Sequence, residues 1–271
     1  MSCTSMNPVD DSKVRAMTFN IRYGTAKDGE NHWDKRKHMV FKVIKDFNPD
    51  FAGLQEALDF QIDAIVQAVP DYKSIGEARD GGKKGEFSAI LYNQTKFDLI
   101  DSDTFWLSDT PEVVSTSWGN TLNRICTWAL LKYKGSDKHV YVYNTHFDHK
   151  SVSSRVQSAK LVIDKIRSRK FKQYPYVLTG DFNATETSLE MNYFSSNNIL
   201  DSDKYVDHKD LNRGSFTGFK FGNYEKKIDY IYISEKQWKV EKSEIIRYSE
   251  ENRYPSDHFP IYAELSLREK K

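Results

Sequence analysis

The residues best suited to chemistry follow a short apolar run in the middle of the chain. The run from Tyr176 to Leu178 predicts a buried strand, which Gly180 would break, and Asp181 and Asn183 come directly afterwards. In extended backbone, residues two positions apart point to the same side, so we expect these two side chains to project together. A carboxylate in this position can deprotonate or orient a water molecule, and a carboxamide can hold an oxyanion. Gly-Asp also begins many ordinary turns, so the interpretation depends on polar residues elsewhere.

Other apolar segments place a polar side chain at a strand end or inside a strand. The segments 14–21, 51–55, 140–146, 228–233 and 260–267 are predicted strands. A charge inside a strand is costly unless it is paired, and a histidine is the obvious partner for Asp229. The polar residues inside these segments, or directly beside them, are Asn20, Glu56, His146, Asp229, Asp257 and His258.

Each of these residues also has an ordinary structural interpretation. Asn20 suits a turn or a cap, Glu56 suits the first turn of a following helix, and His146 suits the protein surface. Chemistry is favoured because six such positions coincide with strand ends. Their oxygen ligands (Asn20, Glu56 and Asp257) suit a hard cation such as Mg²⁺ or Mn²⁺ better than zinc. The sequence contains neither a Gly-x-Ser-x-Gly nucleophile motif nor a phosphate-binding Walker motif.

Length and composition favour one domain over two. The 271 residues contain no linker-like block, so we expect a disordered tail over 1–13 and a single domain over 14–271. Basic and acidic residues number 40 and 39, and a net charge of +1 argues neither for nor against a polyanionic partner. No apolar stretch approaches the roughly 20 residues of a membrane helix. We also expect the protein to be a monomer.

The two cysteines give two different expectations. Cys126 lies in an apolar run and is expected in the core, whereas Cys3 lies in the predicted tail, so no disulfide is expected. The opening residues leave two interpretations of localisation. They are either the remainder of a lipoprotein processed at Cys3, placed in the cell envelope or secreted, or the mobile N-terminus of a cytoplasmic protein.

Helical and extended segments alternate in both halves of the chain. Helical spacing of apolar residues predicts helices from residue 34 to 47, over 58–69 and 154–169, and a short helix over 189–194. The middle instead contains consecutive strands, predicted at 87–92, 96–102, 124–133 and 140–146, and the glycine-rich run 81–85 is expected to be a mobile loop. This mixture favours two packed sheets flanked by helices over a simple parallel sheet.

Six short motifs occur in a fixed order along the chain. They are Thr18-Phe19-Asn20, Leu54-Gln55-Glu56, Asn144-Thr145-His146, Gly180-Asp181-Phe182-Asn183, Ile228-Asp229-Tyr230-Ile231 and Ser256-Asp257-His258. As an ordered set, they resemble the endonuclease/exonuclease/phosphatase superfamily from Met17 to Leu265. The resemblance implies an α/β fold of the α+β type, a four-layer α/β/β/α sandwich with two mixed sheets packed face to face and helices outside. It also implies an active site where the strand ends of the two sheets meet.

The resemblance further implies a role for each polar residue. Glu56 would be the principal ligand of Mg²⁺ or Mn²⁺, with Asn20 and Asp257 beside it. A bound cation and imidazole donors would offset the negative charge that builds up on a phosphate in the transition state.

The remaining residues would act on water and phosphate. Asp181 would align or deprotonate the attacking water, and Asn183 would hold that water or the phosphate. His258 would contact the scissile phosphate with its ring oriented by Asp229, and His146 would donate to a non-bridging oxygen.

The leading hypothesis is therefore a Mg²⁺-dependent phosphoric ester hydrolase that cleaves a phosphodiester or a phosphomonoester. Its substrate would be a nucleic acid, a lipid headgroup or a small phosphorylated metabolite, with Arg124 as either a phosphate contact or a strand-end salt bridge. A DNA repair-type nuclease, acting as an abasic endonuclease or exonuclease, is the alternative. A non-catalytic binding module is disfavoured, because such a protein would be expected to have lost a metal ligand or the pair of His258 and Asp229.

Overall fold

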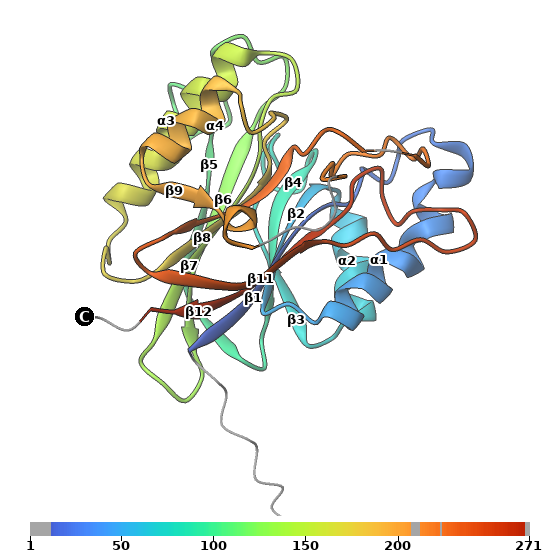
Figure 1. The fold of residues 1–271 in the computed structure, drawn as a ribbon. Helices are drawn as coiled ribbons and strands as arrows, with labels where there is room; N and C mark the ends of the chain where they lie inside the picture. Colours follow the sequence, from blue (N-terminus) through green and yellow to red (C-terminus); the bar gives the residue numbers. More distant parts are fainter. Residues whose placement is uncertain (1–11, 207–211, 223, 269–271) are drawn as a thin grey trace, which may run out of the picture.

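The structure is a computed structural model that describes residues 12–206, 212–222 and 224–268. In this part of the chain, two six-stranded sheets pack face to face (Figure 1). The first sheet has the spatial order β11 (Trp238–Ile245), β12 (Ile261–Leu267), β1 (Lys13–Asn20), β2 (Phe51–Ala57), β4 (Phe87–Asn93) and β3 (Tyr72–Ile75). The second has the order β5 (Phe97–Trp106), β6 (Ile125–Tyr133), β7 (His139–His146), β8 (Tyr176–Asp181), β10 (Asp229–Ser234) and β9 (Ile199–Asp201).

α-Helices cover the outer faces of the sheets (Figure 1), and the described residues form four of them. The first sheet carries α1 (Trp33–Phe47) and α2 (Asp59–Ala68), and the second carries α3 (Val152–Ser168) and α4 (Leu189–Ser196). Short 3₁₀ helices lie at η1 (Gly29–Asn31) and η2 (Ser202–Tyr205). The predicted four-layer sandwich with mixed sheets is confirmed. Among the described residues, no helix combines the length and the apolar character needed to cross a bilayer.

The alternation of side chains in β1 explains how the layers form. Met17 and Phe19 pack in the cluster beneath α1 and α2, whereas Val14 and Ala16 pack between the two sheets. Because side chains alternate along a strand, Asn20 shares the inner face with Val14 and Ala16. The same pattern that buries the core therefore delivers a polar side chain to the space between the sheets.

A polar contact joins the two sheets near their functional end. Nδ2 of Asn144 in β7 donates to the carbonyl oxygens of Leu54 and Ala89, at 2.9 and 2.8 Å, in the opposite sheet. The close approach requires Gly53, because a Cβ at that position would lie only 2.1 Å from Oγ1 of Thr179. Asn144 thus holds β2 and β4 against β7.

Strand directions bring the predicted site residues to one end of the sandwich. β1 runs parallel to β2, and β7 runs parallel to β8, so their carboxyl ends point the same way. β12 is antiparallel to β1 and β10 is antiparallel to β8, which brings the beginnings of these two strands to the same end. Nδ2 of Asn20 donates to Oδ2 of Asp181 at 2.9 Å, and this bond joins the two sheets there.

Two local expectations about strand ends are wrong. Gly180 does not break β8 but lies within it, and a Cβ there would approach the carbonyl oxygen of Thr145 to 2.6 Å. Glu56 does not follow the end of β2. The strand continues to Ala57, and Glu56 lies in a bulge with a left-handed backbone, at φ +57°. Long-range contacts, which local sequence does not report, determine both features.

Smaller differences concern short elements and the N-terminus. The strands β3 and β9 were not expected, because four and three residues are too few to show a period. β5 extends beyond the predicted segment to Trp106. Lys13 begins β1, and the rest of the predicted tail, including Cys3, lies outside the described residues apart from Ser12. Cys126 is buried in the core, as predicted.

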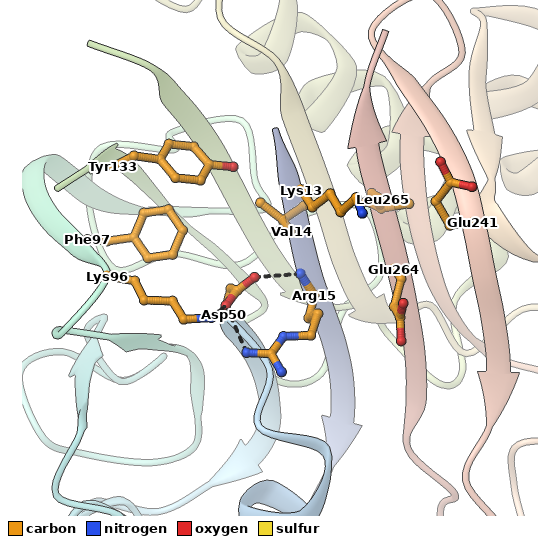
Figure 2. A pocket seen from close by; sticks show the side chains of 10 residues that line it. All are labelled: Lys13, Val14, Arg15, Asp50, Lys96, Phe97, Tyr133, Glu241, Glu264 and Leu265. Carbon is orange, nitrogen blue, oxygen red and sulfur yellow. Dashed lines mark hydrogen bonds and ion pairs between the residues drawn. The ribbon is translucent and has the colours of Figure 1, made fainter. Parts of the chain in front are cut away.

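A cavity of about 570 Å³ lies at the other end of β1, where that strand begins (Figure 2). Its central carboxylate, Asp50, accepts hydrogen bonds from the backbone N–H of Arg15 at 2.8 Å and from Nζ of Lys96 at 2.5 Å. The charge of Asp50 is therefore already compensated. The predicted site residues lie at the opposite end of β1.

Candidate active site

A cavity of about 600 Å³ opens at the end of the sandwich where the two sheets meet. Asn20 lies fully buried beneath it, and Asp229 lies behind one of its lining histidines. The predicted residues that line the cavity directly are Glu56, Arg124, His146, Asp181, Asn183, Asp257 and His258. The structure thus brings all the predicted site residues to one place.

Asn20 connects carboxylates from both sheets. Its Nδ2 donates to Oε1 of Glu56 at 3.1 Å and to Oδ2 of Asp181 at 2.9 Å. Its Oδ1 accepts a hydrogen bond from the backbone N–H of Arg22 at 3.0 Å. In this arrangement the amide positions two carboxylates, and its oxygen already has a partner.

Glu56 and Asp257 form the carboxylate side of the cavity. The guanidinium of Arg22 lies between them, 3.9 Å from Oε2 of Glu56 and 3.8 Å from Oδ2 of Asp257. Burial raises the pKa of Asp257, and the charge of Glu56 adds to the rise. Two carboxylates that converge on a positive charge form an oxygen donor set that a hard divalent cation fits.

Asp181 and Asn183 meet through a turn and not through extended backbone. Oδ1 of Asp181 accepts the backbone N–H of Asn183 at 2.9 Å, and Asn183 has a left-handed backbone, at φ +49°. The predicted alignment of i and i+2 in a strand is therefore wrong, although both side chains line the cavity. Burial and the charge of Asp229 raise the pKa of Asp181 to about 7. A carboxylate with this pKa is suited to accept a proton near neutral pH.

His258 and Asp229 form the expected pair. Nδ1 of His258 lies 2.9 Å from Oδ2 of Asp229, which also accepts a hydrogen bond from Oγ of Ser215 at 2.6 Å. Burial alone would lower the pKa of His258, but the charges of Asp229 and Asp181 outweigh it and raise that pKa well above its usual value. His258 is therefore a cation whose Nε2 lies 3.8 Å from Oδ2 of Asp181.

His146 has the opposite protonation state. Nδ2 of Asn183 lies 3.0 Å from Nε2 of His146 and donates to the carbonyl oxygen of Phe147 at 3.1 Å, so Nε2 is an acceptor. Burial, together with nearby cations of which Arg124 has the largest effect, lowers the pKa of His146 well below its usual value. Donation from Nε2 to a phosphate would require His146 to exchange its contact with Asn183 for the substrate.

Comparison with known proteins identifies the family. Residues 17–258 match the model described as the Endonuclease/Exonuclease/phosphatase family. The chain belongs to this family. Its members are hydrolases of phosphoesters and are generally dependent on divalent metal ions.

Proteins similar to this chain carry descriptions of different activities. A Bacteroides vulgatus member of the endonuclease/exonuclease/phosphatase family is 36% identical, with a TM-score of 0.87 over 94% of this chain and 99% of the other. A Bacteroides thetaiotaomicron protein described as a mannosyl-6-phosphatase is 34% identical, with a TM-score of 0.87 over 93% and 99%. The exoribonuclease subunit Ccr4 of Kluyveromyces lactis is 21% identical. The match covers 87% of this chain and 38% of the Ccr4 subunit.

In a metal-dependent family, the position of the cation matters. Single ligand atoms of Asp181, Asp229 and His258 lie within 4.8 Å of one another, so this group is an alternative to Glu56 and Asp257. However, Asp229 is hydrogen-bonded to a positively charged His258, which repels a second cation. The side of the cavity formed by Glu56 and Asp257 is the better electrostatic fit.

Arg124 forms the predicted salt bridge at the start of β6, whereas its contact with a phosphate stays a prediction. It lines the cavity, its Nη2 lies 3.0 Å from Nδ1 of His149, and its Nε lies 3.6 Å from Oδ2 of Asp148. Sequence reasoning gave no role to several other lining residues, because they lie in connecting segments without a periodic pattern. They are Arg22, Arg79, Glu86, His149, Phe216 and Lys226.

Proposed function

We propose that this chain is a divalent-metal-dependent hydrolase that cleaves a phosphomonoester or a phosphodiester with an activated water. The observation that carries the proposal is the meeting, in one cavity, of Asp181 and His258, with Nε2 of His258 3.8 Å from Oδ2 of Asp181. The water oxygen forms a bond to phosphorus as the bond from phosphorus to the alcohol oxygen breaks. The proton of the water passes to Asp181, and the departing alcohol oxygen takes up a proton from the solvent.

The side chains divide this work by charge. Asp181 orients the water and accepts its proton, and the amide of Asn183 holds the water or a phosphate oxygen. His258 donates Nε2–H to the phosphate, while Asp229 keeps its ring charged and oriented. His146 supports Asn183 at first, and it joins the stabilisation of the phosphate only if Nε2 is released from that amide and takes up a proton.

Glu56 and Asp257 would hold Mg²⁺ or Mn²⁺. The side-chain oxygen of Asn20 would become a further ligand by exchanging its hydrogen bond with the backbone N–H of Arg22 for the ion. When bound, the ion supplies a Lewis acid that offsets charge on the phosphate oxygens. The donor chemistry supports this assignment, because the two carboxylates already face a positive group, the guanidinium of Arg22.

A nuclease is the second candidate, supported by similarity to a relative named as an exoribonuclease subunit. An abasic-site DNA endonuclease belongs to the same class. A nuclease should prefer polynucleotides to small esters, and its binding should weaken steeply as salt is raised.

Hydrolysis of 4-nitrophenyl phosphate, an aryl phosphodiester, single-stranded RNA and abasic duplex DNA should be measured with Mg²⁺, with Mn²⁺ and with a chelator. We expect metal-dependent turnover of at least one ester, reduced about 10³-fold or more in Asp181→Asn and Glu56→Ala. Glu264→Gln, in the cavity at the other end of β1, is the matched control and should retain turnover. Wild-type turnover in both active-site variants would overturn the assignment.

A further inference from the structure

One wall of the active-site cavity carries charged residues to which the proposed hydrolysis gives no role. Arg79 and Glu86 form an ion pair, with Nη1 of Arg79 2.9 Å from Oε2 of Glu86. Both residues line the same cavity as Asp181, and their side chains are only 13% and 16% exposed. An ordinary salt bridge on the protein surface would be more exposed and would add little to the stability of the fold. The position of this partly buried pair at the cavity therefore suggests a role in binding.

Backbone and side-chain contacts hold this pair in place. The backbone N–H of Arg79 donates to the carbonyl oxygen of Glu86 at 2.9 Å, which makes the segment between β3 and β4 a narrow hairpin. The carbonyl oxygen of Arg79 accepts Nε1–H of Trp106 at 2.7 Å, and Asn123 donates to Oδ1 of Asp80 at 2.9 Å. The ion pair is therefore presented to the cavity in a fixed position.

The charges on this wall are balanced. Arg79 is paired with Glu86, and Arg124 lies beside Asp148. A site for a second phosphate or for a polynucleotide backbone needs excess positive charge, which paired residues do not provide. Paired guanidinium and carboxylate groups instead offer donors and acceptors side by side, an arrangement that suits neutral hydroxyl groups.

The same cavity contains apolar surface. Phe216, 39% exposed, packs edge-on against the ring of His258 with centroids 5.0 Å apart, and Leu122 is also 39% exposed. An exposed aromatic ring beside a phosphate-binding histidine can contact the C–H face of a compact ring. Donors, acceptors and an apolar face are the features that a sugar ring requires.

We propose that Arg79 and Glu86 bind adjacent hydroxyl groups on the alcohol portion of the substrate, which is therefore the phosphate ester of a sugar or similar polyol. This inference rests on the proposed function, because it names the substrate class of the same site. It assigns specificity, and not the hydrolytic step, to the hairpin between β3 and β4.

The test compares a hexose 6-phosphate with 4-nitrophenyl phosphate, which has no hydroxyl groups on its leaving portion. In Glu86→Gln and Arg79→Lys, we expect kcat/KM for the hexose phosphate to fall about 10- to 100-fold, mainly through KM. Turnover of the aryl ester should stay within about 3-fold. Lys84→Ala, an exposed change in the same hairpin, is the control and should alter neither substrate.

A second measurement does not depend on turnover of the sugar ester. Free hexose should competitively inhibit wild-type hydrolysis of the aryl ester, and this inhibition should weaken in both variants. Equal losses on both substrates, or no loss on either, would overturn the inference while leaving the hydrolase assignment intact. Failure of the wild type to hydrolyse any phosphoester would instead overturn the proposed function.

Discussion

At the scale of single residues, two histidines in one cavity differ in protonation: the ring of His258 favours the charged form, and the ring of His146 favours the neutral form. His258 faces the carboxylates of Asp229 and Asp181, whereas His146 lies near Arg124 and the positively charged His258. Asp229→Asn removes the charge that most raises the pKa of His258, so its protonated form should persist only at lower pH. We expect activity at pH 8 to fall about 10²- to 10³-fold and the alkaline limb of the kcat/KM profile to move to lower pH. An unmoved alkaline limb would contradict the role of Asp229.

The buried carboxylate of Asp181, which supports the chemistry, should lower the free energy of unfolding of the protein. Its pKa is about 7 in the folded protein against an ordinary value of 3.8, so stability falls as pH rises between these values. With a chelator present, Asp181→Asn should be more stable than the wild type at pH 8, by about 1–3 kcal/mol. The difference should shrink at pH 5, where the folded wild type retains the proton. Thermal unfolding at both pH values measures it, and equal Tm values at pH 8 would contradict the assigned pKa.

At the scale of elements, the bulge in β2 depends on the sheet opposite. Asn144→Ala would leave the buried carbonyl groups of Leu54 and Ala89 without the amide that pairs them. We expect a loss of about 2–4 kcal/mol in the free energy of unfolding and a lower kcat, because Glu56 lies in the loosened bulge. Ser158→Ala in α3 is the control, since its buried hydroxyl has no hydrogen-bond partner among the described residues. Urea unfolding and steady-state kinetics measure both effects, and unchanged stability in Asn144→Ala would contradict the argument.

How far the sequence predicts the site depends on the range of the contacts that form each element. The alternation that sends Asn20 inward is visible within eight residues of β1. The left-handed backbone of Glu56 is not visible in the local sequence, because Asn144, far away in the chain, holds the bulge that contains it. Arg79 and Glu86 were also missed, since their cavity position depends on a hairpin anchored by Trp106. Local patterns predict which residues face inward, and only the docked sheets determine their final geometry.

At the scale of the whole molecule, a bound cation should stabilise the fold. Glu56 and Asp257 come from separate strand regions, and an ion held between them binds only the folded chain. Saturating Mg²⁺ should raise Tm, with a gain of about 2.7 kcal/mol at 100 times Kd, and a chelator should reverse the rise. Glu56→Ala should abolish the shift. A Tm that does not respond to Mg²⁺ or Mn²⁺ would argue against a resident metal ion.

The order of strands in the first sheet has a consequence for synthesis of the chain. β1 lies between β2, which follows soon after it, and β12, which is made more than 200 residues later, directly after His258. A ribosome-bound chain that has already exposed Asn20, Glu56 and Asp181 still lacks its cationic histidine. Such a nascent chain would stay inert until β12 leaves the exit tunnel and takes its place beside β1, so phosphoester cleavage would begin only after that step.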